Sequence, residues 1–74
     1  MKVEMLKVTP NHTETLYECN GERALTALRS YGVVLCDLCE VNPNWHVCSG
    51  AYSVTLFDVS TEKYILSYQI HIID

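Results

Sequence analysis

Residues 20–41 read NGERALTALRSYGVVLCDLCEV, a stretch that contains the clearest helical pattern in the chain. Over residues 22–31, apolar side chains recur at three- and four-residue spacing, which predicts an amphipathic helix with the stripe Ala24, Leu25, Leu28 and Tyr31. Asn20 suits the N-cap, because its side-chain oxygen can accept a hydrogen bond from an early helical N–H. Gly32 suits the left-handed position that ends many helices, so we expect the helix to stop there.

Residues 33–41 are apolar at both alternating sets of positions and rich in valine. A strand that is apolar on both faces is typical of the centre of a sheet, so this pattern predicts a central strand. Alternation and turn residues predict the other strands at residues 2–8, 13–19, 52–59 and 64–73, while residues 45–49 fit no clear pattern.

The resulting element order is β-β-α-β-β-β. It predicts an α+β fold in which one helix packs on one face of a mostly antiparallel sheet. A chain of 74 residues makes a single domain, residues 1–74, whose core is thin.

The composition argues against several classes of protein. Apolar residues make up 49% of the chain and the net charge is −4, which together are unlike an intrinsically disordered segment. The five basic residues are scattered, whereas nucleic-acid binding needs a clustered basic face, so we expect no direct nucleic-acid binding.

The chain has no apolar run near the roughly 18 residues of a membrane span, so we expect no membrane association. Its first residues also lack the apolar segment of a signal peptide. We therefore expect a cytoplasmic protein, in which cysteines are more often free thiols or metal ligands than disulfides.

A cluster of thiols and an imidazole, Cys36, Cys39, His46 and Cys48, is the strongest chemical signal in the sequence. These are the ligand types of structural zinc, and the first pair has the usual C-x2-C spacing. If residues 33–41 form a strand, however, Cys36 and Cys39 project from opposite faces and cannot hold one ion. The two interpretations are therefore exclusive: free thiols with no cofactor, or one structural zinc in a Cys3His site.

Catalytic signatures are missing from the sequence. The three glycines are isolated and form no phosphate-binding loop, and no local pattern joins a cysteine to a base and an orienting group. We therefore expect that the protein is not an enzyme and has no catalytic residues.

Binding to another protein is the remaining class. Aromatic side chains near turns are typical contact residues, and the candidates for partner binding are Trp45, His46, Asn44 and Tyr17. A sheet covered by one helix leaves its other face open, which residues 33–41 would line through Val33, Leu35, Cys39 and Val41 or through the opposite set of side chains. The last strand, if it is an edge, invites pairing with another chain, so a homodimer through an edge strand or the open face is a second form of partner.

The sequence thus predicts a small non-enzymatic module that covers a surface of another protein. In size, mild acidity and lack of catalytic motifs it resembles the small accessory proteins of phages and mobile elements. Many of those are viral inhibitors of a host enzyme or defence complex, so this resemblance, which rests on size and composition, implies an inhibitor. The alternative is a small domain stabilised by zinc at Cys36, Cys39, His46 and Cys48.

Overall fold

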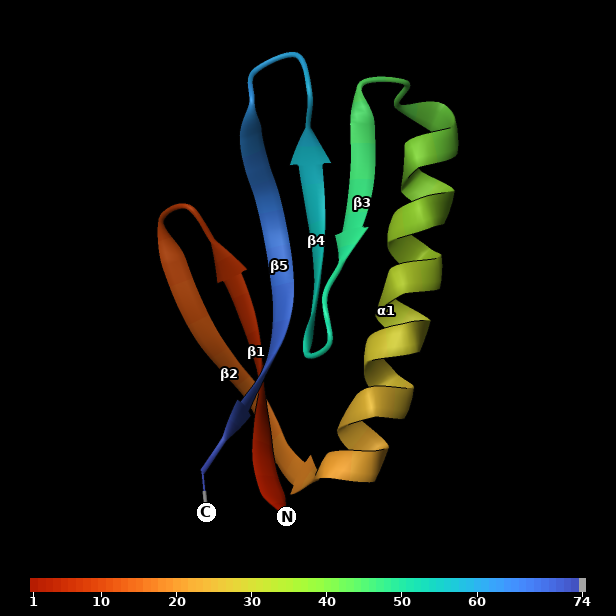
Figure 1. The fold of residues 1–74 in the computed structure, drawn as a ribbon. Coiled ribbons are helices and arrows are strands. Elements are labelled where there is room, and N and C mark those ends of the chain that lie inside the picture. The colour runs from red at the N-terminus through yellow and green to blue at the C-terminus, as the bar shows by residue number, and fades with distance from the viewer. Residues whose placement is uncertain (74) are drawn as a thin grey trace.

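Five strands and one helix make up residues 1–73, the part of the chain that the computed structural model describes (Figure 1). The elements in chain order are β1 (Lys2–Thr9), β2 (His12–Asn20), α1 (Gly21–Val41), β3 (Trp45–Ser49), β4 (Ser53–Asp58) and β5 (Lys63–Ile72). The strands form one antiparallel sheet in the spatial order β2-β1-β5-β4-β3. The predicted α+β fold class and the order β-β-α-β-β-β are confirmed.

Two hairpins account for much of the sheet. Pro10 and Asn11 alone join β1 to β2, and the hydroxyl of Thr9 donates to the carbonyl of His12 at 3.2 Å across this turn. Residues 59–62 join β4 to β5, where a carboxylate oxygen of Asp58 accepts from both the N–H and the hydroxyl of Ser60. Short connections of this kind place consecutive strands side by side and antiparallel.

The core lies between α1 and one face of the sheet, and the helix contacts all five strands. Its buried apolar residues come from β1, α1 and β4: Val3, Met5, Ala24, Leu28, Leu35, Val54 and Leu56. A group of half-buried tyrosines extends this core. The ring of Tyr31 stacks on that of Tyr68 with centroids 4.2 Å apart, and its hydroxyl lies 2.7 Å from the hydroxyl of Tyr17. These contacts tie α1 to β5 and β2.

The helix begins where the sequence predicts and ends ten residues later than predicted, at Val41 instead of Tyr31. The Asn20 side-chain oxygen accepts from the backbone N–H of Arg23 at 2.8 Å, which confirms it as the N-cap. The expected stop at Gly32 is wrong, because α1 continues through it. At the actual end, the side-chain amide of Asn42 donates to the carbonyl of Leu38 at 2.9 Å, and Pro43 then prevents another helical turn.

The predicted strand over residues 33–41 is therefore wrong, since this segment is the second half of α1. Leu35 is buried and Cys39 packs against the core, so both continue the helical stripe that begins with Leu28. The other apolar residues of the segment point elsewhere and do not line the open face of the sheet. The third strand of the chain is instead β3, in the segment that fits no pattern in the sequence.

The last strand, β5, is not an edge, which corrects a second prediction. It lies in the middle of the sheet and pairs with β1 on one side and β4 on the other (Figure 1). Among the described residues, the edges are β2 and β3. A homodimer through an unpaired edge of the last strand is therefore not possible in this fold.

Replacing Gly32 with alanine tests the position of this residue inside the helix. Glycine in a helix interior costs about 1 kcal/mol relative to alanine. An added Cβ would lie 3.7 Å from Val54, an ordinary contact distance, and Gly32 has no positive φ. We expect Gly32→Ala to raise the free energy of unfolding by about 0.5–1 kcal/mol in urea denaturation. A destabilised variant would instead indicate the left-handed helix end that the sequence suggests.

The tyrosine group predicts a loss of stability at alkaline pH. Burial, with the hydrogen bond to Tyr17 as a second cause, raises the pKa of Tyr31 from 10.0 to about 12. The folded state therefore favours the protonated phenol, and this contribution is complete below pH 10 and is lost as the pH rises from 10 through about 12. In urea denaturation at increasing pH, Tyr31→Phe should show a weaker dependence over this window. Tyr52→Phe, at an exposed ring, should keep the wild-type dependence.

Candidate functional site

The side of α1 that points away from the sheet changes character halfway along the helix. In the first half it carries the polar and exposed residues Glu22, Arg23, Thr26, Arg29 and Ser30. In the second half it carries large exposed apolar side chains: Val33, Val34 and Val41 are 63%, 58% and 76% exposed, and Leu38 is 38% exposed. With two exposed carboxylates they form a surface that we name the α1 outer face, made of Val33, Val34, Asp37, Leu38, Glu40 and Val41.

These side chains form two rows along the helix. Val33, Asp37 and Val41 follow one another at four-residue spacing, and Val34 and Leu38 form a second row beside them. The first row spans about 12 Å along the helix axis, at 1.5 Å per residue. Rows of this kind are the ridges against which a second helix packs.

The charges on the α1 outer face have no partners among the described residues. Among residues 1–73, Lys2 forms an ion pair with Glu18 and Glu4 lies against the His71 ring, and the last turn of α1 holds no basic residue. Asp37 and Glu40 lie near the C-terminal end of α1, which is the negative end of the helix dipole, and a carboxylate is unfavourable there. The surface is both apolar and uncompensated in charge.

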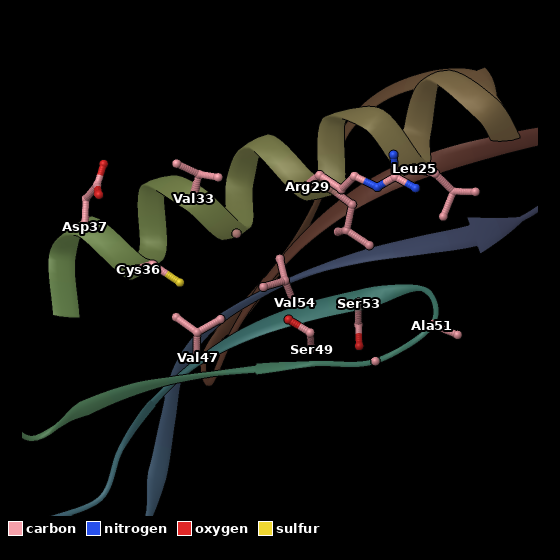
Figure 2. A pocket seen from close by; sticks show the side chains of 13 residues that line it. Leu25, Arg29, Val33, Cys36, Asp37, Val47, Ser49, Ala51, Ser53 and Val54 are labelled. Atoms are coloured by element: carbon pink, nitrogen blue, oxygen red, sulfur yellow. The ribbon is translucent and has the colours of Figure 1, made fainter.

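A groove borders the α1 outer face on the side of β3 and β4 (Figure 2). Its volume is about 480 Å³, and Figure 2 shows Cys36 of α1 and Val47 and Val54 of the sheet turned toward the space between helix and strands. Val33 and Asp37 line the helix side of the groove and also belong to the outer face. The apolar surface of α1 is therefore continuous with this groove.

A second groove, of about 600 Å³, lies at the other end of α1. Apolar side chains dominate its lining, among them Met1, Leu25, Tyr52 and Ile72, all of which are exposed. Leu25 also lines the first groove, so the two meet at this residue. Neither lining contains a histidine that could serve a cysteine as a base.

The structure does not bring the predicted Cys3His residues together. Cys36 lines the groove and Cys39 packs against the core, so both lie between α1 and one face of the sheet. His46 and Cys48 alternate along β3 with Val47, which lines the groove, and they therefore point to the opposite face. Among residues 1–73, no group of three or more potential ligands is placed to hold a metal ion. Burial, with Cys36 nearby as a second cause, also raises the pKa of the Cys39 thiol.

The four predicted contact residues do not form one surface. Trp45 is half-buried and packs against the core. Tyr17 lies on β2, at the opposite edge of the sheet from β3, and its hydroxyl lies beside that of Tyr31 on α1. Asn44 and His46 are exposed, and the Asn44 carbonyl accepts from the N–H of Val59 at 2.8 Å. The structure thus leaves Asn44 and His46 accessible beside a tryptophan that serves the core.

The face of the sheet opposite α1 already satisfies its polar groups. Ser67 is only 2% exposed, and its hydroxyl lies 2.9 Å from that of Thr55 and accepts from the Gln69 amide at 3.2 Å. Next to them, a ring nitrogen of His71 lies 2.9 Å from a carboxylate oxygen of Glu4. Because the polar side chains at the centre of this face already have hydrogen-bond partners, this face gains less from burial by a partner than the α1 outer face does.

Sequence reasoning missed the α1 outer face, although the sequence contains a signal for it. Leu28, Leu35 and Cys39 keep helical spacing past Gly32. Once these residues are assigned to the core stripe, the remaining apolar residues of the segment must lie on other sides of the helix. A helix that is apolar on both sides within one stretch marks a candidate contact surface.

Comparison with known proteins adds no functional information. No protein-family model, curated protein sequence or solved structure matches the chain. Within residues 1–73, no helix combines the length and the hydropathy that crossing a bilayer requires.

Thiol labelling tests the separation of the four cysteines. Cys36 and Cys48 are exposed, whereas Cys19 and Cys39 are half-buried. With an alkylating reagent at neutral pH, followed by peptide mass spectrometry, we expect Cys36 and Cys48 to react first and a metal chelator to change no rate. Joint protection of Cys36, Cys39 and Cys48 that a chelator removes would contradict this arrangement and indicate the zinc site.

Proposed function

We propose that this chain is a non-enzymatic protein-binding module and that the α1 outer face is its contact surface. The observation that carries the proposal is the run of exposed valines on the second half of α1, with Val33, Val34 and Val41 all more than half exposed. Single exposed apolar residues are ordinary, but a contiguous apolar surface on a small domain is typical of a binding site. The adjoining groove adds concave space in which an anchoring side chain of a partner can be buried.

Several features favour binding over catalysis. Titratable groups that approach one another include the structural pairs Tyr17 with Tyr31, Glu4 with His71 and Lys2 with Glu18. The cysteines are free and distributed over both faces of the sheet, which suits a protein of the reducing cytoplasm. In the mode of action that fits best, the module covers a surface of a host enzyme or defence complex and so inhibits it, as do the small phage proteins that the chain resembles.

The test compares substitutions of exposed apolar residues at two sites. A partner is first captured on the immobilised chain from a lysate of the organism that encodes it, and its affinity is then measured with purified proteins. We expect Val34→Ser with Val41→Ser to weaken this binding about tenfold or more, because truncation of central apolar contacts costs more than about 1 kcal/mol each. Both side chains are exposed, so the folded state should persist, which far-ultraviolet circular dichroism can verify.

Val59→Ser is the matched control, because Val59 is also apolar and 46% exposed but lies in the turn between β4 and β5. This variant should keep the wild-type affinity. A double variant that binds the partner as tightly as the wild type, or a control that loses as much affinity, would refute the α1 outer face as the contact surface.

A further inference from the structure

We propose that the partner of the α1 outer face presents a basic amphipathic helix, with lysine or arginine beside apolar residues. This inference rests on the proposed function and specifies the chemistry of its partner. It is carried by the position of the carboxylates Asp37 and Glu40 among the exposed apolar side chains Val33, Val34, Leu38 and Val41 on the outer side of α1.

Charge decides the sign of the partner. Asp37 and Glu40 add to the negative end of the helix dipole, and no basic residue of the last turn offsets them. The nearest basic residue before them on α1 is Arg29, two helical turns ahead of Asp37 on the wall of the groove. A cation of the partner would therefore meet two carboxylates near the negative end of the helix dipole, while a carboxylate there would be repelled.

Shape and backbone chemistry favour a helix as the partner element. The outer face is the side of the helix α1, and a helix bonds its backbone groups along its own length, so this face offers no sheet edge for strand addition. Its side chains form rows at four-residue spacing. Such rows are the ridges that fit into the grooves of a second helix when two helices pack. A partner helix with apolar residues at three- and four-residue spacing would bury Val34, Leu38 and Val41.

The same charges disfavour other occupants. In a two-fold pairing of outer faces, each copy would bring Asp37 and Glu40 close to those of the other, and like charges at an interface are costly. An anionic lipid surface or a nucleic acid would be repelled for the same reason, and the chain has a net charge of −4. Pairing with a second copy is the occupant that the experiment below distinguishes from the one proposed.

The experiment uses two synthetic helical peptides as probes, with the same length and the same leucine positions. One peptide carries lysine at every charged position and the other carries glutamate. Binding to the full chain is measured by fluorescence anisotropy at increasing salt concentration. We expect the lysine peptide to bind with an affinity that falls as salt rises, and the glutamate peptide to bind about tenfold more weakly or not at all.

Charge-neutral variants locate the binding. Asp37→Asn with Glu40→Gln should weaken the lysine peptide about fivefold, the loss expected for two exposed ion pairs. Because this double variant removes unfavourable charges from the end of α1, it should fold at least as well as the wild type. The matched control is Glu14→Gln with Glu62→Gln, which neutralises two exposed carboxylates away from α1 and should change the affinity less than about twofold.

The outcomes separate this inference from the proposed function. Equal weakening by both double variants, equal binding of the two peptides, or no binding of the lysine peptide would overturn the basic partner. If the natural partner loses affinity for the Val34→Ser, Val41→Ser chain but not for the Asp37→Asn, Glu40→Gln chain, the binding surface stands and its charge preference falls. A dimer of the wild-type chain that the valine substitutions dissociate would assign the surface to a second copy and overturn the inference.

Discussion

The fold depends on one packing constraint: a single helix must cover one face of a five-stranded sheet. Leu28 and Leu35 are buried between α1 and the sheet, opposite Met5 and Leu56, and nearly all of the apolar core lies in this one layer. A short chain buries a small share of its surface, so each turn of the helix adds appreciably to the apolar surface that is buried on folding. This requirement explains why α1 continues for 21 residues, through a glycine at its middle, before Asn42 and Pro43 end it.

The demand for a long helix gives the second half of α1 an unusual composition. Its inner side continues the core stripe with Leu35 and Cys39, as the fold requires. Its outer side holds valines, which are weaker helix formers than alanine, lysine or glutamate because their χ1 freedom is restricted. Nothing in the packing of residues 1–73 uses Val33, Val34 or Val41, which are mostly exposed. Their presence is explained if a contact outside this chain uses them.

The sequence predicts the fold class, the β1–β2 and β4–β5 hairpins and the N-cap at Asn20, because these depend on local patterns. It fails at residues 33–41, where two apolar sets are superimposed: one set packs on the sheet and the other is exposed. Together the two sets leave few polar positions in this segment. Its sequence then has the same apolar pattern as a strand that is buried on both faces. The central place of β5 is also not in the sequence, since strand order is decided by tertiary pairing. Trp45 and Tyr17 are aromatic, which makes them predicted contact residues, and in the structure both pack against the core.

The error at residues 33–41 and the proposed site have the same physical cause. Natural sequences are consistent across local propensity, pattern and packing, and the places where they are not are often functional. On α1, two independent features are unfavourable for the chain alone: exposed valines lose the benefit of burial, and Asp37 and Glu40 oppose the helix dipole. A neutral apolar partner would relieve the first, and a purely basic one the second. A basic amphipathic helix relieves both at once, which makes it the occupant that accounts for the composition of the whole face.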